Sequence, residues 1–327
     1  MSKVKADDVA RTAGLSRAAV SRAFRQDGPI SEDKRARILS VAEQLGYRPP
    51  SAEAVAKITD RTITLVAADL ENPFYPVVAN AFSQAIHGSG RRLILHLVPP
   101  RQDVDTVLRQ VMDYRSEAAI VTSSLMSSRI AKECRAHNMP VVLFNRVQSD
   151  RQMTAVTCDN YGGGRLAAEH FINLGRRHIA LLGGRHDTST HLERRRGFQD
   201  RLEEAGLRLY HEANGAFDYD TAFFATRRLL EADSAPDALF CLNDIMALAA
   251  LDAARGLNIP VPDELAVIGF DDIPMSGWPA YRLTTIRQPL QRMVADTLEL
   301  IDRQKNNPGE PGVIRVAAVE LIKRATA

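Results

Sequence analysis

From Thr62 onward, short runs of β-branched and aliphatic residues alternate with amphipathic segments about every thirty residues. This alternation is typical of βαβ units, and uninterrupted apolar runs are typical of parallel strands that helices cover on both faces. About 265 residues of such units fit two sheets better than one wide sheet. We therefore expect an α/β core of two lobes, with strands at TITLVAADL, RLILHLV, AAIVTS, PVVLFN, AVTCD, HIALLGG, ALFCLN, LAVIGFDD and a closing VIRVAAVEL.

The first fifty residues follow a helical period instead. A first helix is predicted from about Ala6 to Ala13, where Gly14 permits the backbone conformation that ends it. Ser16 is a good N-cap for a second helix over about residues 17–25, and a third helix starts at the N-cap residue Ser31 and ends near Leu45. One small core is expected from the apolar side chains of Val9, Ala10, Leu15, Val20, Phe24, Ile38, Leu39, Ala42 and Leu45.

The stretch that joins these parts reads YRPPSAEAVAKITDR, from Tyr47 to Arg61. Two prolines precede an alanine-rich segment that is too short to be a stable helix by itself. We predict an all-α headpiece over residues 1–48, a hinge over 49–61 and a core over 62–327. Within the core, one lobe is expected to hold about 62–160 plus 289–320, and the other about 161–288 plus 321–327.

Composition and charge narrow the class of protein. Apolar residues at 45% and charged residues at 25% are ordinary for a globular chain. The net charge of +2 does not distinguish between classes of protein. Its distribution is more informative, because residues 1–60 contain eleven Lys and Arg and only eight Asp and Glu, a basic excess that is compatible with a nucleic-acid partner. No apolar run is long enough to span a bilayer, and the start lacks the apolar stretch of a secretory signal. We expect a cytoplasmic, nucleoid-associated protein with no membrane partner.

Catalytic, metal and cofactor sites are not expected. Several polar residues are close in sequence but lack the spacing of a triad or a metal site, namely His178, His186, Asp187, Ser189 and His191. The glycines at 162–164 begin a helix, where a tight turn is a better interpretation than an anion site. The cysteines are odd in number, far apart and in apolar runs, which predicts reduced, buried thiols at Cys134, Cys158 and Cys241.

The first two predicted helices and their short turn form a helix-turn-helix, whose second helix would lie in the major groove of DNA. Its exposed residues would be Arg17, Ala18, Ser21 and Arg22. Arginine can donate two hydrogen bonds to guanine, so Arg17 and Arg22 are the best candidates for base recognition. An arginine on an exposed helix could equally be a solvated side chain. The arrangement as a whole favours a DNA-binding unit.

The segments DVARTAGLSRAAVSRAF, IS and RILSVAEQLGYRP resemble the headpiece of the lactose-repressor (LacI/GalR) family of bacterial transcriptional regulators. The resemblance continues, in the family's order and spacing, through ENPFY, FNR, DNYGGGRLAAEHFINLGRRHIALLGG, RRRGF, CLNDIMALAALDAARGLNIPVPDELAVIGFDD and LTTIRQP. It implies a homodimeric repressor, operator DNA as partner, a hinge helix ordered on DNA, and a periplasmic-binding-protein-like (type I) core for a sugar-like effector. The DNA-contacting candidates are then Ser16, Arg17, Ala18, Ser21, Arg22, Arg25, Ser31, Tyr47, Val55 and Ala56.

The hinge departs from the family pattern. The family usually has an asparagine after the proline and a leucine that wedges into the minor groove, whereas this chain has Pro50 and Ala56 at those positions. The linker is also one residue longer than the usual pattern. Val55 or Ile58 could act as the wedge instead, since inserted apolar side chains kink DNA.

Polar residues follow several predicted strands of the core, where ligands bind in open α/β sheets. By the resemblance, Arg194 and Asp271 would grip the effector and Phe74 and Phe217 would pack against it. The other candidates are Tyr75, Arg146, Asp159, Thr190, Asn243 and Gln288. From the residues alone, Asn72-Pro73, Asn243-Asp244 and Asp271-Asp272 could be turn and cap chemistry, and the two phenylalanines could be core.

The pairing of an arginine with an aspartate suits a neutral polyhydroxy ligand, because both groups bond to hydroxyls. Trp278 would lie nearer the subunit contact than the ligand. Two other classes of protein remain open at this point: a solute-binding protein of the sugar-receptor type without a regulatory role, and a sugar-metabolising α/β enzyme. The headpiece opposes the first, and the absence of a catalytic motif opposes the second.

Overall fold

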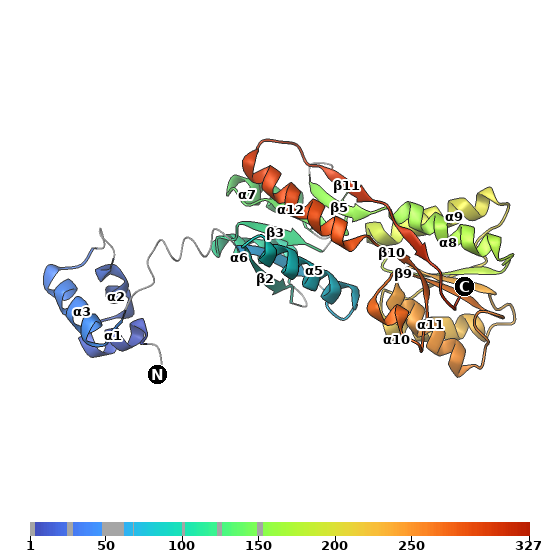
Figure 1. The fold of residues 1–327 in the computed structure, drawn as a ribbon, viewed down its shortest axis with the longest axis horizontal. Helices are drawn as coiled ribbons and strands as arrows, with labels where there is room; N and C mark the ends of the chain where they lie inside the picture. Colours follow the sequence, from blue (N-terminus) through green and yellow to red (C-terminus); the bar gives the residue numbers. More distant parts are fainter. Residues whose placement is uncertain are drawn as a thin grey trace. The chain divides into compact units, whose positions relative to one another are not determined.

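The computed structural model describes residues 4–24, 29–47, 62–67, 69–99, 102–122, 126–148 and 153–327. The chain divides into two compact units, Met1–Ile58 and Thr59–Ala327 (Figure 1). In the described part of the chain, no helix is long and apolar enough to cross a membrane.

The first unit contains three helices, α1 (Ala6–Ala13), α2 (Arg17–Ala23) and α3 (Glu32–Gln44). Gly14 adopts φ +65°, which confirms the predicted turn. The Ser16 hydroxyl accepts a hydrogen bond from the Ala19 amide at 3.2 Å, which confirms the predicted N-cap. Val9, Ala10, Val20, Ile38 and Ala42 form the buried core together with Ala13, Ala19 and Ala23.

The prediction that Leu39 belongs to the core of this unit is wrong, because Leu39 is 42% exposed. Leu39 follows Ile38, which is fully buried, and successive residues of a helix point about 100° apart. The helix can therefore direct only one of the two side chains into so small a core.

The first lobe of the second unit is a six-stranded sheet in the order β11-β5-β4-β3-β1-β2, and its paired strands are parallel. The strands are β1 (Thr62–Ala67), β2 (Arg92–Leu97), β3 (Ala118–Val121), β4 (Val141–Phe144), β5 (Thr154–Cys158) and β11 (Ile314–Ala317). The helices are α5 (Phe74–Gly88), α6 (Val104–Asp113), α7 (Ser128–Ala136) and α12 (Leu290–Asn306).

Alternate residues of the buried strands in this lobe serve two different hydrophobic cores. Ile120 packs in the layer that contains α5 and α12, whereas its neighbour Val121 packs in the layer that contains α6 and α7. Because successive strand side chains point to opposite faces, a run that is apolar at every position is what a sheet covered on both sides requires.

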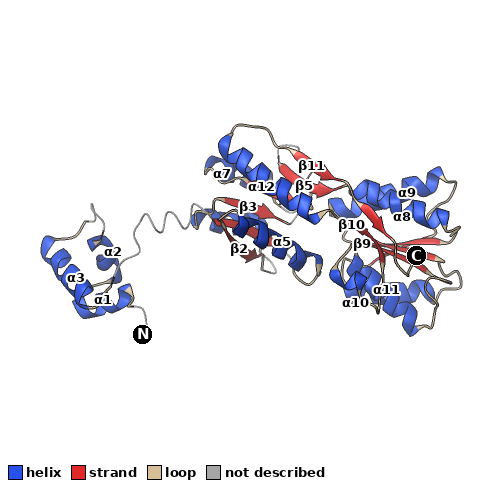
Figure 2. Cartoon of the chain, in the orientation of Figure 1, coloured by secondary structure: helices blue, strands red, loops and turns tan. Residues whose placement is uncertain are grey.

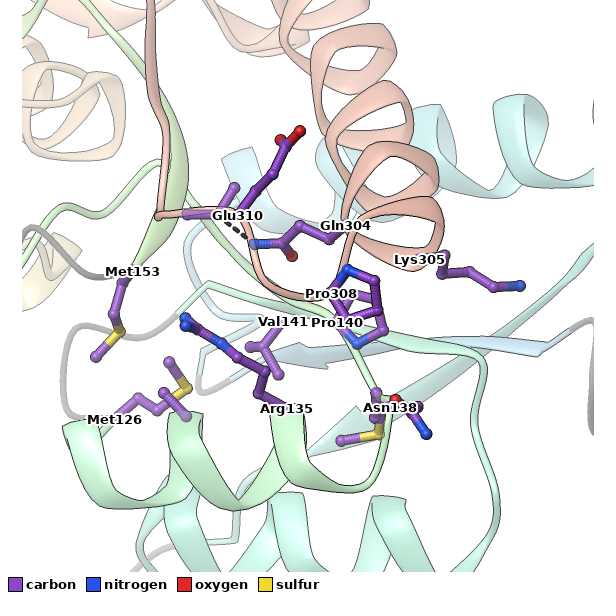
Figure 3. Close-up of a pocket in the computed structure, with 13 residues that line it drawn as sticks. Met126, Arg135, Asn138, Pro140, Val141, Met153, Gln304, Lys305, Pro308 and Glu310 are labelled. Atoms are coloured by element: carbon purple, nitrogen blue, oxygen red, sulfur yellow. Dashed lines mark hydrogen bonds between the residues drawn. The ribbon is translucent and has the colours of Figure 1, made fainter.

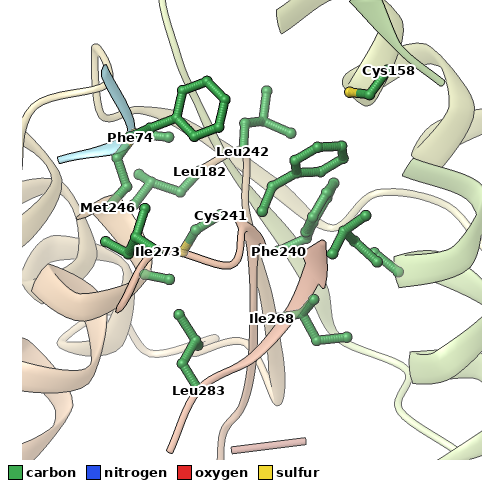
Figure 4. Packing of buried hydrophobic residues seen from close by; sticks show 14 of the residues in the cluster. Phe74, Cys158, Leu182, Phe240, Cys241, Leu242, Met246, Ile268, Ile273 and Leu283 are labelled. Atoms are coloured by element: carbon green, nitrogen blue, oxygen red, sulfur yellow. The ribbon is translucent and has the colours of Figure 1, made fainter. Parts of the chain in front are cut away.

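The second lobe is also a six-stranded sheet, in the order β12-β10-β9-β8-β6-β7 (Figure 2). Its strands are β6 (Ile179–Gly183), β7 (His211–Asn214), β8 (Ala238–Cys241), β9 (Ala266–Asp271), β10 (Thr284–Arg287) and β12 (Glu320–Ile322). The helices are α8 (Asn160–Asn173), α9 (Ser189–Glu204), α10 (Tyr219–Leu230), α11 (Asp244–Gly256) and the 3₁₀ turn η1 (Pro274–Gly277). Phe240, Ile268 and Leu283 belong to the buried apolar layer of this lobe (Figure 4).

The strand prediction needs three corrections. The closing run VIRVAAVEL is not one strand, because β11 pairs with β5 in the first sheet and β12 pairs antiparallel with β10 in the second. Strand β7 was missed because it is a half-exposed edge strand with the polar sequence HEAN. Strand β10 was missed because it is a run of only four residues, TTIR, that ends in an exposed arginine.

The chain passes between the lobes at three places, after β5, after β10 and after β11. The predicted burial of Cys134, Cys158 and Cys241 is confirmed, and all three are free thiols. Burial raises the pKa of the Cys158 thiol to about 12, so this group stays protonated and unreactive at neutral pH.

Candidate DNA-binding face and effector site

Helix α2 has one buried and one exposed face. Ala19, Val20 and Ala23 pack into the headpiece core. The opposite face exposes the side chains predicted to touch DNA: Ser16, Arg17, Ala18, Ser21 and Arg22. The structure therefore exposes two serines, two arginines and one alanine at the start of the second helix of a helix-turn-helix, where base edges are read.

The two arginines on this face have only weak internal partners. The Arg17 Nε lies 3.6 Å from the Asp7 carboxylate, and 74% and 59% of their side chains are exposed. The Arg22 Nε donates to the Ala18 carbonyl of its own helix at 3.2 Å. Exposed pairs of this kind contribute about 0–1 kcal/mol, so both side chains can turn to a DNA surface at little cost.

The remaining predicted DNA contacts have mixed positions. Ser31 is the exposed N-cap of α3, and its side chain makes no capping bond. Tyr47 is half-buried and packs edge-on against Phe24, with ring centres 5.8 Å apart. The other predicted residues lie outside the described part of the chain: Arg25, Val55 and Ala56, together with the hinge residues Pro50 and Ile58.

In the core, the buried guanidinium of Arg194 is the centre of the predicted effector residues. It projects from α9, whose start is fixed because the Thr188 hydroxyl accepts the His191 amide. The Nε donates to the Asn160 amide oxygen at 2.8 Å, and Nη2 lies 3.4 Å from the Asp271 carboxylate. The guanidinium also lies 3.5 Å from the centre of the Phe270 ring. Its orientation is thus set before any ligand arrives.

Asp271 is the last residue of β9, and it has φ +119°. Its carboxylate accepts a hydrogen bond from the Gln288 amide at 2.7 Å. Burial raises the pKa of Asp271 to about 6, while the positive charge of Arg194 opposes that rise. The carboxylate is therefore mostly ionised at neutral pH and is paired with Arg194.

Arg146 connects the two lobes. It follows β4 of the first lobe, and its Nη2 donates to the Tyr75 hydroxyl of α5 at 2.9 Å. Its Nη1 donates to the Thr190 hydroxyl of α9 in the second lobe. Tyr75, Arg146, Thr190, Arg194, Asp271 and Gln288 are called the effector cluster below. Printed contacts join these sequence-predicted residues in two groups, Tyr75–Arg146–Thr190 and Arg194–Asp271–Gln288. The charge of Arg146 also opposes the rise in the pKa of Asp271 that burial causes, so the two groups are close to each other.

Three amide side chains, one in this cluster and two next to it in sequence or space, each have one polar atom without a hydrogen-bond partner. Asn145 Oδ1, Asn243 Nδ2 and Gln288 Oε1 are buried and have no hydrogen-bond partner among the described residues. The Asn243 Oδ1 caps α11 by accepting a hydrogen bond from the Met246 amide at 3.1 Å. The Gln288 Nε2 donates a hydrogen bond to the Asp271 carboxylate. An unsatisfied buried polar group costs about 1–3 kcal/mol, so each of these atoms needs a partner that the described residues do not supply.

The two predicted aromatic contacts are placed differently. Phe74 is 3% exposed and packs against Tyr75 within the apolar cluster (Figure 4). Phe217 is half-buried at φ +62°, and its ring covers Gly184 so closely that a Cβ there would lie 2.1 Å from it. The glycine at position 184 therefore makes room for the ring of Phe217.

Like Asn243, Asp159 has a structural use as a helix cap. Its carboxylate accepts the Gly162 amide at 2.8 Å and so caps α8. It lines a hollow of about 880 Å³ with Leu192, Ile314 and Val316, and no other predicted effector residue lines that hollow. Its neighbour Asn160, which holds Arg194, was missed, although it follows the same strand end.

Asp244 and Asp272 fit the turn-and-cap interpretation. The Asp244 carboxylate accepts the Ile273 amide at 2.9 Å and the Ser276 hydroxyl at 2.7 Å, which fixes η1. Burial raises the pKa of Asp244 to about 8. Asp272 pairs with Arg287 and Arg324. Both aspartates thus make contacts that stabilise the second lobe.

A cavity of about 160 Å³ lies in the first lobe, where β4 and β5 begin, between α7 and the end of α12 (Figure 3). Met126, Val141, Met153, Gln304 and Pro308 are among its lining residues. None of the predicted effector residues lines this cavity. In the described residues, no group of three or more His, Cys, Asp or Glu side chains could hold a metal ion.

Comparison with known proteins identifies the class of protein to which this chain belongs. The model of "Bacterial regulatory proteins, lacI family" matches residues 5–50, and that of "Periplasmic binding protein-like domain" matches residues 168–327. The HTH-type transcriptional regulator DegA of Bacillus subtilis (strain 168) is 30% identical over 97% of this chain and 96% of its own length. The HTH-type transcriptional regulator GalR of Escherichia coli (strain K12) is 30% identical over 97% and 94%.

Solved structures agree with these sequence matches. A complex of the transcriptional regulator CelR with cellobiose matches with a TM-score of 0.73 at 26% identity, over 99% of this chain and 100% of that chain. A lac repressor dimer bound to operator and the anti-inducer ONPF matches with a TM-score of 0.76 at 24% identity, over 99% of both chains.

The fold and the two sites define a DNA-binding transcriptional regulator, with a helix-turn-helix headpiece and a two-lobed core that responds to a small-molecule effector. The relatives that carry this conclusion are regulators and not enzymes. The chain belongs to the lacI family of bacterial regulatory proteins.

Proposed function

We propose that this regulator is a repressor whose sugar-like effector binds at the effector cluster. The observation that carries the proposal is the coincidence of the Arg194–Asp271 pair with three half-satisfied buried amides. Such a set of fixed donors and acceptors suits a ligand with several hydroxyl or carbonyl groups. The cellobiose complex of CelR supports a sugar, because that regulator has the same fold.

Coupling between the effector and DNA would use the contacts that join the lobes. Arg146 bonds to α5 of one lobe and α9 of the other, and the Val147 amide donates to the Ser189 hydroxyl at 3.0 Å. A ligand that exchanges these bonds for its own changes how the lobes meet. Any change in operator affinity caused by the effector must be matched by an equal change in effector affinity caused by the operator.

The proposed DNA contacts are made by α2, with Arg17 and Arg22 reading bases, and by a homodimer on a two-fold symmetric operator. Exposed apolar side chains on the edge strand β2 support a subunit contact, namely Ile94, Leu95 and Leu97, and Trp278 is 53% exposed. The operator of the lac repressor dimer supports the DNA partner. The proposed place of action is the cytoplasm, on the nucleoid, and the proposed role includes no catalysis.

The proposal is tested by a thermal-shift and mobility-shift screen with sugars and related metabolites, comparing the wild type with Arg194→Ala. The variant should lose the ligand-induced rise in melting temperature and the ligand response of operator binding. Arg196→Ala is the matched control, since Arg196 lies on the same helix but is exposed and pairs with Glu193. Thr190→Val serves where Arg194→Ala does not fold. Normal ligand binding in both cluster variants would place the effector elsewhere.

A further inference from the structure

Among the described residues, Arg146 has no carboxylate within salt-bridge distance, whereas Arg194 and Arg185 near the effector cluster each have one. Arg194 lies 3.4 Å from Asp271, and Arg185 lies 3.0 Å from Asp187. The partners of Arg146 are the hydroxyls of Tyr75 and Thr190, and no carboxylate lies within salt-bridge distance of it in the described parts of the chain. Its positive charge is half-buried, and the nearest described carboxylates that its charge affects, Asp187 and Asp271, are each paired with another arginine.

The charges of the cluster therefore do not balance. Arg194 and Asp271 cancel, and the nearby Asp244 carboxylate is surrounded by the donors Ile273, Ser276 and Thr285. Both oxygens of Asp244 are thus occupied within the second lobe, so this carboxylate does not serve as a partner for Arg146. Over the described residues of the cluster, Arg146 therefore remains as one net positive charge. A half-buried charge without a counter-ion is unfavourable, and an anion brought by a ligand would relieve this cost.

The geometry of Arg146 leaves donors for such an anion. A guanidinium has five N–H groups, and Arg146 uses one from each terminal nitrogen for Thr190 and Tyr75. These two bonds hold the planar fork across the junction of the lobes. The other N–H groups, including that on Nε, can donate to two oxygens of one carboxylate, which is the arrangement that arginine favours.

We propose that the effector carries a carboxylate that binds to Arg146, and that its chemical class is therefore a sugar acid, an aldonate or a uronate. This rests on the proposed function of the effector cluster. It departs from the neutral ligand that the arginine–aspartate pairing alone suggests, because Arg146 adds a charge which that pairing does not cancel. One net positive charge matches one carboxylate better than a phosphate monoester, which carries nearly two negative charges at neutral pH.

The experiment measures dissociation constants by calorimetry for matched probes: D-galacturonate and D-galactose, D-glucuronate and D-glucose, D-gluconate and D-sorbitol. D-glucose 6-phosphate is the phosphate arm. The wild type should bind at least one acid about tenfold or more tightly than its neutral partner, because a charge-assisted hydrogen bond has roughly that effect. Arg146→Gln should bring that ratio close to one, and Arg146→Lys should keep part of it. Arg195→Gln is the control, since Arg195 already pairs with Glu212.

The outcomes separate the two proposals. Tighter binding of a neutral sugar than of its acid, or an equal loss of both in Arg146→Gln, overturns the charge assignment and leaves the effector cluster in place. Preference for the phosphate ester overturns the carboxylate and leaves an anion site. Failure of every probe to bind the wild type overturns the sugar acid and the sugar-like effector together.

Discussion

The Arg194 guanidinium and the Asp271 carboxylate lie 3.4 Å apart inside the second lobe, with 2% and 4% of their side chains exposed. The arginine comes from α9 and the aspartate from the end of β9, so only the packed lobe brings them together. A buried pair of this kind fixes geometry more surely than it adds stability, since both charges lose their hydration.

Breaking this pair on one side should be costly. Arg194→Met leaves the Asp271 charge buried without its partner, and we expect the free energy of unfolding in urea to fall by about 3–5 kcal/mol. The double variant Arg194→Met/Asp271→Asn removes that charge as well and should regain part of the loss. A double variant that is less stable than Arg194→Met would show that the two groups are not coupled as a pair.

Stability should depend on pH through Asp244. Its pKa is raised by burial from 3.8 to about 8, so the folded protein binds this proton more tightly than the unfolded chain. The contribution is therefore fully present below about pH 4 and is lost as pH rises towards about 8. Asp244→Asn imitates the protonated acid, and its unfolding free energy should fall less than that of the wild type across this range. Parallel pH profiles for the two proteins would argue against the raised pKa.

Operator affinity should depend on Arg22. Arg22→Ala removes a side chain from the exposed face of α2, and operator binding should weaken by about 1–3 kcal/mol while effector binding stays the same. Fluorescence anisotropy with a labelled operator at fixed salt measures this. Arg196→Ala in the core is the control and should bind the operator like the wild type. An unchanged operator affinity in Arg22→Ala would remove this residue from the proposed reading face.

The contact between α8 and α9 should not tolerate a side chain at position 164. A Cβ on Gly164 would lie 2.1 Å from the Arg194 carbonyl oxygen and 2.8 Å from the Phe198 nitrogen. Gly164→Ala should therefore lower the free energy of unfolding by at least about 1–3 kcal/mol, and it should weaken effector binding because it displaces the helix that carries Arg194. Gly256→Ala is the matched control, since no atom lies within 4 Å of its Cβ, and it should be neutral or slightly stabilising. Equal effects of both substitutions would mean that the helices can separate without loss.

Local signals in the sequence determined the secondary-structure elements of this protein and the candidate site residues at their ends. Gly14 and the N-cap Ser16 fix the turn between α1 and α2 through contacts within a few residues. The central strands β1, β3, β8 and β9 are visible as apolar runs because both of their faces are covered. Polar residues at the ends of such runs, such as Arg146 and Asp271, could each be assigned to the carboxyl edge of their own sheet, because parallel strands end on the same side.

Contacts between distant segments decided the rest, and no local pattern contains them. Only the packed sheets divide the run VIRVAAVEL between two lobes, select Ile38 over Leu39 for the headpiece core, and use Asp159 as a cap while Asn160 holds Arg194. The net charge of the effector cluster is also decided by contacts between distant segments. The sequence determined that Arg146, Arg194 and Asp271 are present, and the tertiary structure decided which of them neutralise one another, because pairing depends on distances that only the folded chain sets.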